Sequence, residues 1–177
     1  MDTVETRRLR GERIHPRHWE LWWSMGADTT LTATLGGVWT EAQAREKLLW
    51  NCQQWEQNGH GQWLFFLKGT GAFVGRCGLR RMMVNDREEI ELGYSVLPKL
   101  WGNGFATEMG ETALHVAFER FNYPSVVAFT LVRNERSIRV MQRLGLSFDA
   151  TITHAGQPHV LYRRTNPRGR HGPPSDL

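Results

Sequence analysis

One stretch of the chain constrains its fold more than any other, because the spacing of its apolar residues changes partway along it. In residues 88–97 apolar and polar residues alternate, which is typical of a β-strand with one buried face. In residues 104–121 apolar residues recur at helical spacing instead, over about five turns of 3.6 residues. The connecting loop contains Pro98, Gly102 and Gly104. A strand that leads through such a loop into an amphipathic helix requires a domain in which helices pack on a sheet.

The remaining sequence continues this pattern of strands and helices. Strand character is found in residues 6–14, 62–68, 72–82, 88–97, 126–132, 148–154 and 159–164. Helical spacing is found after Pro16 and in residues 40–58, 104–121 and 134–144. Thr40 and Gln43 have the form of a capping box, and Asn134 is an N-cap candidate. No linker or internal repeat divides the chain, so we expect one α/β domain, a mixed sheet with helices on both faces.

The composition excludes several classes of protein. Hydrophobic residues make up 40% and charged residues 23%, and eight Trp and eight Phe supply too much apolar surface for a disordered chain. The longest apolar run, residues 63–67, is far below the roughly 20 residues that a membrane span needs. The first residues lack the pattern of a secretory signal. Only Cys52 and Cys77 occur, which argues against a disulfide scaffold or a cysteine-based zinc site and favours a reducing, cytoplasmic location.

The net charge of +4 is concentrated at the C-terminal end. Residues 163–177 contain four Arg and one Asp, so they carry +3 and leave +1 for the rest of the chain. A nucleic-acid-binding domain is expected to have a basic face on its folded part, so nucleic acid is not an expected partner. We predict a folded domain in residues 1–165 and a disordered basic tail in residues 166–177. That tail is either simply solvated or docks on an acidic partner.

The glycine loop before the long helix is a candidate anion site. Gly102 and Gly104 allow backbone N–H groups to point into the loop, and the start of a helix adds partial positive charge. The alternative is an ordinary glycine turn. A P-loop is excluded because the chain has no Gly-x-x-x-x-Gly-Lys-Ser/Thr run. A dinucleotide fingerprint is disfavoured because Thr107 replaces the third small residue and residue 122, about 20 residues after the first glycine, is Asn and not an acid.

Six short motifs are distributed along the chain. They are Thr6-Arg7-Arg8-Leu9-Arg10, residues 71–79 with Gly75 and Gly78-Leu79, Glu91-Leu92-Gly93-Tyr94, residues 100–108, Asn134-Glu135-Arg136-Ser137 and Arg143-Leu144-Gly145-Leu146. Together they resemble the GCN5-related N-acetyltransferase (GNAT) superfamily, and more closely its branch of ribosomal-protein N-terminal (alanine/serine) acetyltransferases. The resemblance covers about residues 5–165. It implies a mostly antiparallel sheet of six to seven strands, with the fourth and fifth strands splayed apart.

The resemblance implies that the protein binds acetyl-CoA as a co-substrate and uses no metal. The family's pyrophosphate loop falls on Lys99, Leu100, Trp101, Gly102, Asn103 and Gly104 and continues into Phe105 and Ala106. Lys99 departs from the usual Arg or Gln, but such a loop acts mainly through backbone N–H groups. Val96 and Leu97 are expected to offer backbone groups to the pantetheine arm. Asn134 matches the position that hydrogen-bonds the cofactor, and Ser137 matches the position near the thioester sulfur.

Two side chains, Glu91 and Ser137, are the catalytic candidates. Glu91 lies opposite the apolar row of its strand and matches the family's acidic position before Gly-Tyr, so we expect it to act as the general base. The alternative is a solvated carboxylate, because Glu88 and Glu89 precede it. Many superfamily members carry a Tyr seven residues after the Asn as general acid, and here that position is Met141. Ser137 is the nearest substitute.

The resemblance makes the N-terminal α-amine of a protein or peptide the expected acceptor. Two alternatives stay open: acetylation of a small amine such as an antibiotic or polyamine, and acyl-CoA binding without catalysis. No membrane partner is expected, and assembly as a homodimer stays open. The family's first two helices help to form the acceptor site, so Trp19, Trp22, Trp23 and Trp55 are either core residues or substrate contacts. The seven His residues are scattered and suggest no set of three metal ligands.

Overall fold

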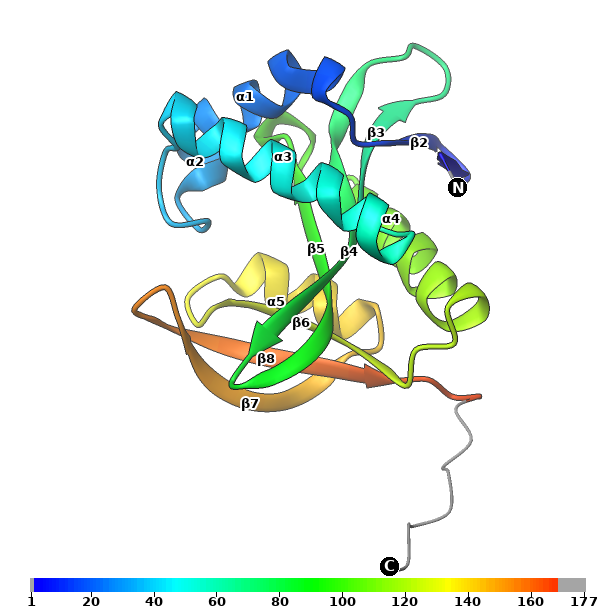
Figure 1. Cartoon of the computed structure of the whole chain (residues 1–177), viewed down its shortest axis with the longest axis vertical. Helices are drawn as coiled ribbons and strands as arrows, with labels where there is room; N and C mark the ends of the chain where they lie inside the picture. Colours follow the sequence, from blue (N-terminus) through cyan, green and yellow to red (C-terminus); the bar gives the residue numbers. More distant parts are fainter. Residues whose placement is uncertain (1, 169–177) are drawn as a thin grey trace, which may run out of the picture.

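The computed structural model describes residues 2–168 as one eight-stranded sheet with associated helices (Figure 1). The strands are β1 (Thr3–Glu5), β2 (Leu9–Arg13), β3 (Gln62–Leu67), β4 (Phe73–Val84), β5 (Arg87–Val96), β6 (Ser125–Leu131), β7 (Ser147–His154) and β8 (Gln157–Thr165). The helices are η1 (Pro16–His18), α1 (Trp19–Ala27), α2 (Thr29–Thr32), α3 (Glu41–Asn58), η2 (Pro98–Leu100), α4 (Phe105–His115), η3 (Val116–Arg120) and α5 (Glu135–Arg143). The strand order is β1-β2-β3-β4-β5-β6-β8-β7, and only β5 and β6 pair in parallel. The predicted mixed, mostly antiparallel α/β fold is confirmed.

The alternation of side chains along β5 assigns helices to the two faces of the sheet. Tyr94 points to the face where its hydroxyl contacts Ser137 of α5. Arg76, which is opposite Ser95 in the β4–β5 ladder, points to the other face and lies against Trp22 of α1. The helices α1, α2 and α3 gather together over this second face (Figure 1). Helix α4 packs beside α5, since the missing side chain of Gly110 leaves room for Leu144.

The predicted first strand, residues 6–14, is shorter in the structure, where it is β2, and a further strand, β1, precedes it. The Thr6 hydroxyl accepts a hydrogen bond from the Leu9 N–H (2.8 Å), and the Thr6 N–H donates to the Leu9 carbonyl (2.9 Å). Because Thr side chains can bond nearby backbone groups in this way, Thr6 favours a turn here. The chain therefore reverses, and β1 pairs antiparallel with β2. This gives eight strands rather than the six or seven expected.

Several helix boundaries follow the predicted caps. Thr40 and Gln43 form the expected capping box of α3, which ends at Gly59 with a φ of +70°. The Asn134 side chain accepts from the Ser137 N–H and caps α5 as predicted. The predicted helix 104–121 divides into α4 and η3, a π-helical segment. Helix α2 was not predicted, because four residues are too few to show a helical period.

Strands β5 and β6 lie side by side over a short distance only. Their pairing is at a single position, where Glu91 is opposite Val127. Beyond that position β5 continues to Val96, still paired with β4 at Gly75. Within residues 2–168, the C-terminal half of β5 therefore has one edge without a strand partner. The predicted fourth and fifth strands, residues 88–97 and 126–132, correspond to β5 and β6. Their predicted splay is confirmed.

The C-terminal end of the described chain is fixed to the body of the protein. The Asn166 N–H donates to the Pro124 carbonyl (2.8 Å), its Nδ2 donates to the Tyr123 carbonyl (3.1 Å), and the residue is buried. The predicted boundary at residue 165 and the predicted disordered tail stay predictions, since residues 169–177 lie outside the described part. No helix among the described residues has the length and apolarity that crossing a membrane requires.

Candidate active site

The loop between β5 and α4 presents unpaired backbone donors. Gly102 and Gly104 have φ values of +82° and +76°, in the left-handed region that glycine adopts without strain. Gly104 is the N-cap of α4 and offers no side-chain cap. Within residues 2–168, no hydrogen bond uses the backbone N–H of Gly102, Asn103 or Gly104. A helix start with free N–H groups carries partial positive charge, and these are the features of an anion site.

Side chains from the β1–β2 turn hold this loop in place. Glu108, in the first turn of α4, accepts from the Thr6 hydroxyl (2.5 Å), the Arg8 N–H (2.8 Å) and Arg8 Nε (2.6 Å). Arg8 Nη2 also donates to the Asn103 carbonyl (2.9 Å), and its guanidinium lies 4.3 Å from the centre of the Phe105 ring. Arg8 and Glu108 are 100 residues apart in the chain, so sequence spacing gives no signal for their contact.

Acidification is expected to weaken this link. Burial alone raises the pKa of Glu108, but the hydrogen bonds from Thr6 and Arg8 outweigh burial and hold the pKa below its ordinary value of 4.5. A carboxyl whose pKa is lowered on folding stabilises the protein above its unfolded pKa, and this contribution is lost as the pH falls through the folded value. We expect Glu108→Gln to melt below wild type at neutral pH, with a difference that shrinks as the pH falls below 4.5. Melting temperatures of both proteins across this range test the link, and a constant difference contradicts it.

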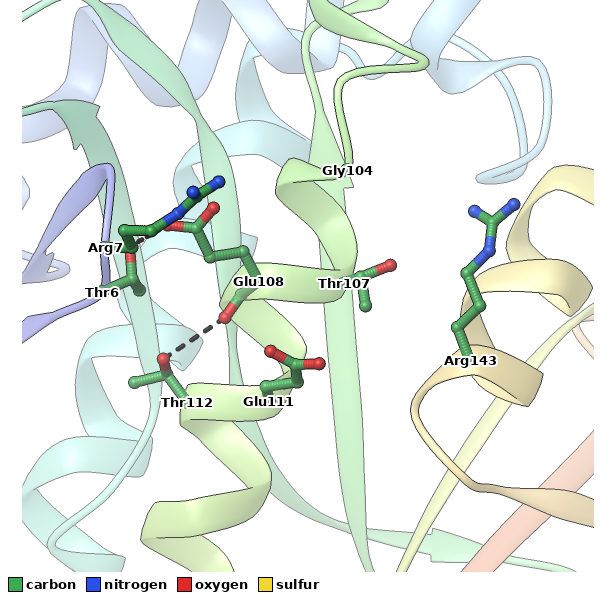
Figure 2. Close-up of a pocket in the computed structure, with 8 residues that line it drawn as sticks. All are labelled: Thr6, Arg7, Gly104, Thr107, Glu108, Glu111, Thr112 and Arg143. Atoms are coloured by element: carbon green, nitrogen blue, oxygen red, sulfur yellow. Dashed lines mark hydrogen bonds between the residues drawn. The ribbon is translucent and has the colours of Figure 1, made fainter.

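A cavity of about 630 Å³ lies beside the start of α4 (Figure 2). Thr6 and Arg7 of the β1–β2 turn line one side, and Arg143 of α5 lines the other. Gly104 and Thr107 of α4 lie between them. Glu108 and Glu111 line the same cavity, so its two Arg side chains are balanced by two carboxylates and the case for an anion rests on the free N–H groups of the loop.

The backbone groups of Val96 lie on the edge of β5 that β6 leaves uncovered. The Leu97 N–H donates to the Val74 carbonyl (2.9 Å), so the groups of the preceding Val96 face the opposite way, toward the gap. The Val96 carbonyl accepts from the Trp101 indole (2.7 Å). The Leu97 carbonyl accepts from the Leu100 N–H (2.9 Å), so both backbone groups of Leu97 are used within the chain. Of the two residues expected to offer backbone groups here, Val96 faces the gap and Leu97 does not.

Ser137 has a phenol neighbour that was not expected. The Tyr94 hydroxyl lies 2.8 Å from Ser137 Oγ and 3.0 Å from the Ser137 carbonyl oxygen. Burial raises the pKa of Tyr94, so its phenol is protonated at neutral pH. Met141, at the position where a Tyr was sought, is fully buried. The alternation along residues 88–97 places Tyr94 opposite Glu91, but only the structure brings Tyr94 to Ser137.

The other residues expected to bind the cofactor surround the same gap. Lys99, Gly102, Asn103 and Gly104 are exposed, Leu100, Trp101 and Ala106 are half-buried, and Phe105 is buried. Asn134 lies at the start of α5, where its Nδ2 donates to Thr130 Oγ1 (2.8 Å) and its Oδ1 caps the helix. The structure thus brings together the glycine loop, the end of β5 and the start of α5.

Glu91 lies on the opposite face of β5 from Ser137, in a buried ion pair. Its side chain is 4% exposed, and its two oxygens accept from Arg80 Nε and Arg80 Nη2, each at 2.7 Å. The alternative of a solvated carboxylate is therefore wrong. The two catalytic candidates are not in contact, because β5 lies between them. They stand on either side of the strand whose edge is uncovered.

The Trp residues divide between the core and the face that carries Glu91. Four Trp residues were expected to be either core residues or substrate contacts. Of these, Trp22 and Trp55 are buried, and Trp19 and Trp23 are half-buried. The Trp22 ring centre lies 5.2 Å from the Arg76 guanidinium. The ring of Trp50, which was not among them, lies 5.7 Å from the Arg80 guanidinium. The described residues hold no cluster of three His, Cys, Asp or Glu side chains suited to a metal ion.

A known family matches most of this chain. The family model described as an acetyltransferase (GNAT) domain matches residues 8–147, which include the glycine loop, the uncovered edge of β5 and the start of α5. The chain belongs to the GNAT acetyltransferase family and is an acyltransferase.

The curated proteins similar in sequence include one from a bacterium and one from a fungus. The uncharacterized protein YkkB of Bacillus subtilis strain 168 is 28% identical over 137 residues, which cover 77% of this chain and 80% of YkkB. The FsC-acetyl coenzyme A-N(2)-transacetylase of Aspergillus fumigatus is 28% identical over 160 residues, which cover 85% of this chain and 67% of the fungal protein. The name of the fungal protein describes a transacetylase that uses acetyl coenzyme A.

Solved structures share the fold at low sequence identity. An acetyltransferase from Agrobacterium tumefaciens superposes with a TM-score of 0.82 at 22% identity, covering 93% of this chain and 94% of its own. RimL, a ribosomal L7/L12 α-N-protein acetyltransferase solved with coenzyme A, has a TM-score of 0.75 at 15% identity (92% and 97% covered). Spermidine N-acetyltransferase from Vibrio cholerae, solved with CoA and spermine, has a TM-score of 0.72 at 14% identity (90% and 96% covered).

Proposed function

We propose that the protein transfers the acetyl group of acetyl-CoA to the α-amino group at the N-terminus of a protein or peptide, as in the ribosomal-protein branch. The observation that carries this proposal is the uncovered edge of β5, which begins after the single Glu91–Val127 pair and ends at the glycine loop. A gap with backbone groups along one side can hold an extended chain such as the pantetheine arm. The loop at its end can hold a pyrophosphate.

The proposed donor site uses the residues around this gap. The pyrophosphate binds the free N–H groups of residues 102–106, with Lys99 close by, and the pantetheine arm runs along Val96. Ser137 lies near the thioester sulfur, and Asn134 holds the start of α5 in place. The acceptor approaches from the face that carries Glu91. Its amine attacks the thioester carbonyl directly in a ternary complex, and Glu91 receives the proton through a water molecule.

The preference for an N-terminal amine rests on proton chemistry and charge. An α-amino group has a pKa of about 7.7–8.0 against about 10.4 for Lys, so at neutral pH it is deprotonated a few hundred times more often. Around Glu91, Arg76 and Arg80 add positive charge that opposes a polycationic acceptor such as spermine. Two structural neighbours act on these different acceptors, RimL on a protein α-amine and the Vibrio cholerae enzyme on spermidine.

Tyr94 supplies the acid that Met141 cannot. A thiolate that leaves next to Ser137 can receive the proton of the Ser137 hydroxyl. The Tyr94 hydroxyl, 2.8 Å from Ser137 Oγ, then donates its own proton to Ser137. Burial raises the pKa of Tyr94, so its phenol is protonated at neutral pH before each transfer, and solvent returns the proton to Tyr94 afterwards. The presence of this pair weakens the alternative of an acyl-CoA-binding protein without catalysis, which the missing Tyr at residue 141 had suggested.

Removing the Tyr94 hydroxyl is expected to slow turnover without weakening donor binding. For Tyr94→Phe we expect kcat to fall about tenfold, less than the 10²–10⁴-fold typical of an essential acid, because CoA thiolate leaves readily. Tyr123→Phe is the matched control, since its hydroxyl also makes a partly buried 2.8 Å hydrogen bond, to His60 Nε2, but away from the gap. Equal kcat values for the two variants would remove Tyr94 from the reaction.

The acceptor class is tested by CoA release from acetyl-CoA over a panel of matched amines. The panel contains a peptide with a free N-terminus, the same peptide with a blocked N-terminus and an internal Lys, spermidine and an aminoglycoside. We expect release with the free peptide and little with the others. CoA release only with spermidine or the aminoglycoside would show that the protein acetylates small amines. No CoA release with any of the four would support acyl-CoA binding without catalysis.

A further inference from the structure

The guanidinium of Arg76 is buried on the face of the sheet that carries Glu91, and it pairs with no carboxylate of the described residues. Arg76 of β4 is 7% exposed, and its Nη1 donates a long hydrogen bond of 3.4 Å to Gln62 Oε1. Its guanidinium also lies against the Trp22 ring. No carboxylate among residues 2–168 forms a salt bridge with Arg76, since both oxygens of the neighbouring Glu91 accept from Arg80.

The local charges therefore do not balance. Arg76 and Arg80 contribute two positive charges, and Glu91 contributes one negative charge. Burial lowers the pKa of Arg76 to about 10, so the guanidinium still carries its charge at neutral pH. A buried charge without a partner is costly, and Arg is well shaped to bind a carboxylate with two parallel hydrogen bonds. An incoming anion would balance the excess charge.

Arg76 stands where an acceptor would meet the donor. It is directly opposite Ser95 in the β4–β5 ladder, and Ser95 precedes Val96 at the uncovered edge. Ser95, Gly93 and Glu91 share one face of β5. Gly93 lets these polar side chains lie close to the backbone, since a Cβ there would be only 2.9 Å from Arg80 Nη2 and 3.2 Å from Glu91 Oε2. A ligand on this face thus meets a carboxylate and an unpaired guanidinium together.

The approach to this face is also cationic. The partly exposed Trp50 lies over Arg80, whose side chain is 21% exposed. His154, at the end of β7, is close enough for its pKa to respond to the charges of Glu91, Arg80 and Lys47 of α3, although burial is the largest cause of its lowered pKa. The charged groups of this face are thus Arg76 and Arg80 against one paired carboxylate.

We propose that Arg76 binds a carboxylate of the acceptor, so that the substrate is an amine bearing a carboxylate close to the reacting nitrogen. This inference rests on the proposed acetyl transfer and narrows its acceptor. The carboxylate has two sources: an acidic side chain near the N-terminus of a peptide, or the carboxylate of a small amino acid. Glu91 orients the amine end while Arg76 holds the carboxylate end, which fixes the nitrogen in front of the thioester.

The test compares carboxylate acceptors with their amides on the wild-type protein. Peptides that begin Ser-Asp and Ser-Asn form one pair, and free glutamate and glutamine form the other. We expect kcat/KM to favour the acid over its amide by about tenfold or more in one pair, since charge-assisted hydrogen bonds to Arg are about twice as strong as neutral ones. The pair that shows the preference identifies the source of the carboxylate.

Variants locate the preference at Arg76. In Arg76→Gln the ratio between acid and amide is expected to fall to near one, with KM for acetyl-CoA unchanged, and Arg76→Lys is expected to retain part of it. Arg163→Gln is the matched control, because Arg163 is a half-buried Arg on the same sheet that already pairs with Glu89 and Asp149. That control should keep the wild-type ratio.

The outcomes separate this inference from the proposed function. If every acid and amide is acetylated equally well by the wild-type protein, the carboxylate site is wrong and acetyl transfer stands. A preference that survives in Arg76→Gln also overturns the assignment to Arg76. If no amine is acetylated, the proposed function fails and the inference fails with it. The wild-type comparison decides the question even where Arg76→Gln does not fold.

Discussion

Glu91→Gln is expected to fold and to bind CoA, but to lose most turnover. We expect kcat to fall roughly 10²–10⁴-fold, the range typical for removal of a general base. The Gln side chain keeps one oxygen to accept from Arg80, so part of the buried contact survives. The other oxygen is replaced by an N–H donor facing a cation, and we expect a loss of about 1–3 kcal/mol in unfolding free energy.

Glu89→Gln is the matched control for this loss of stability. Glu89 is two residues earlier on the same face of β5, and its two oxygens accept from Arg163 at 2.7 and 2.9 Å. Its replacement damages an ion pair of the same kind, before the point where β5 and β6 diverge. Steady-state kinetics and urea unfolding of both variants test the role of Glu91. A near-normal kcat in Glu91→Gln, or an equal loss in Glu89→Gln, would remove Glu91 from the mechanism.

Gly102→Asp is expected to abolish tight binding of CoA. A Cβ at Gly102 meets no atom within 4 Å, so the Asp side chain fits into open space beside the free N–H groups. That space is where the pyrophosphate is proposed to lie, and two like charges a few ångströms apart near a protein surface repel by about 1–4 kcal/mol. We expect the dissociation constant of CoA, measured by calorimetry, to rise about 100-fold.

Gly71→Asp separates the charge effect from backbone strain. Gly71 lies in the β3–β4 turn, also has a positive φ of +70°, and also has no atom within 4 Å of a Cβ. The same substitution there adds the same charge and similar strain, away from the proposed donor site. Gly71→Asp should bind CoA as wild type does. Equal weakening in both variants, or none in Gly102→Asp, would contradict the placement of the pyrophosphate.

Local sequence signals predict much of the fold because they act over short distances. The Thr40–Gln43 capping box and the Asn134 cap are formed as predicted, since each is a contact between residues three apart. The splay of β5 and β6 came from the resemblance and is confirmed by their single paired position, which involves Glu91. The strand β1 and the turn that follows it were missed, because the alternation of a strand does not reveal a turn closed by Thr6.

The site was less accessible to sequence reasoning because its decisive contacts are long-range. Tyr94 meets Ser137 across 43 residues, and the bidentate partner of Glu91 is Arg80 on the neighbouring strand. The period of a strand shows which side chains share a face, but not what lies above that face. The unpaired charge of Arg76 is likewise invisible in the sequence, since it depends on which Arg forms the ion pair with Glu91.

The account is tested most directly by locating the acetyl group on a product. A peptide with a free N-terminus, an acidic second residue and an internal Lys is incubated with the protein and acetyl-CoA, and the product is sequenced by tandem mass spectrometry. The account predicts a single acetyl group on the α-nitrogen, absent when Glu91→Gln replaces wild type at the same concentration. Acetyl groups on Lys alone, or equal modification without the protein, would contradict it.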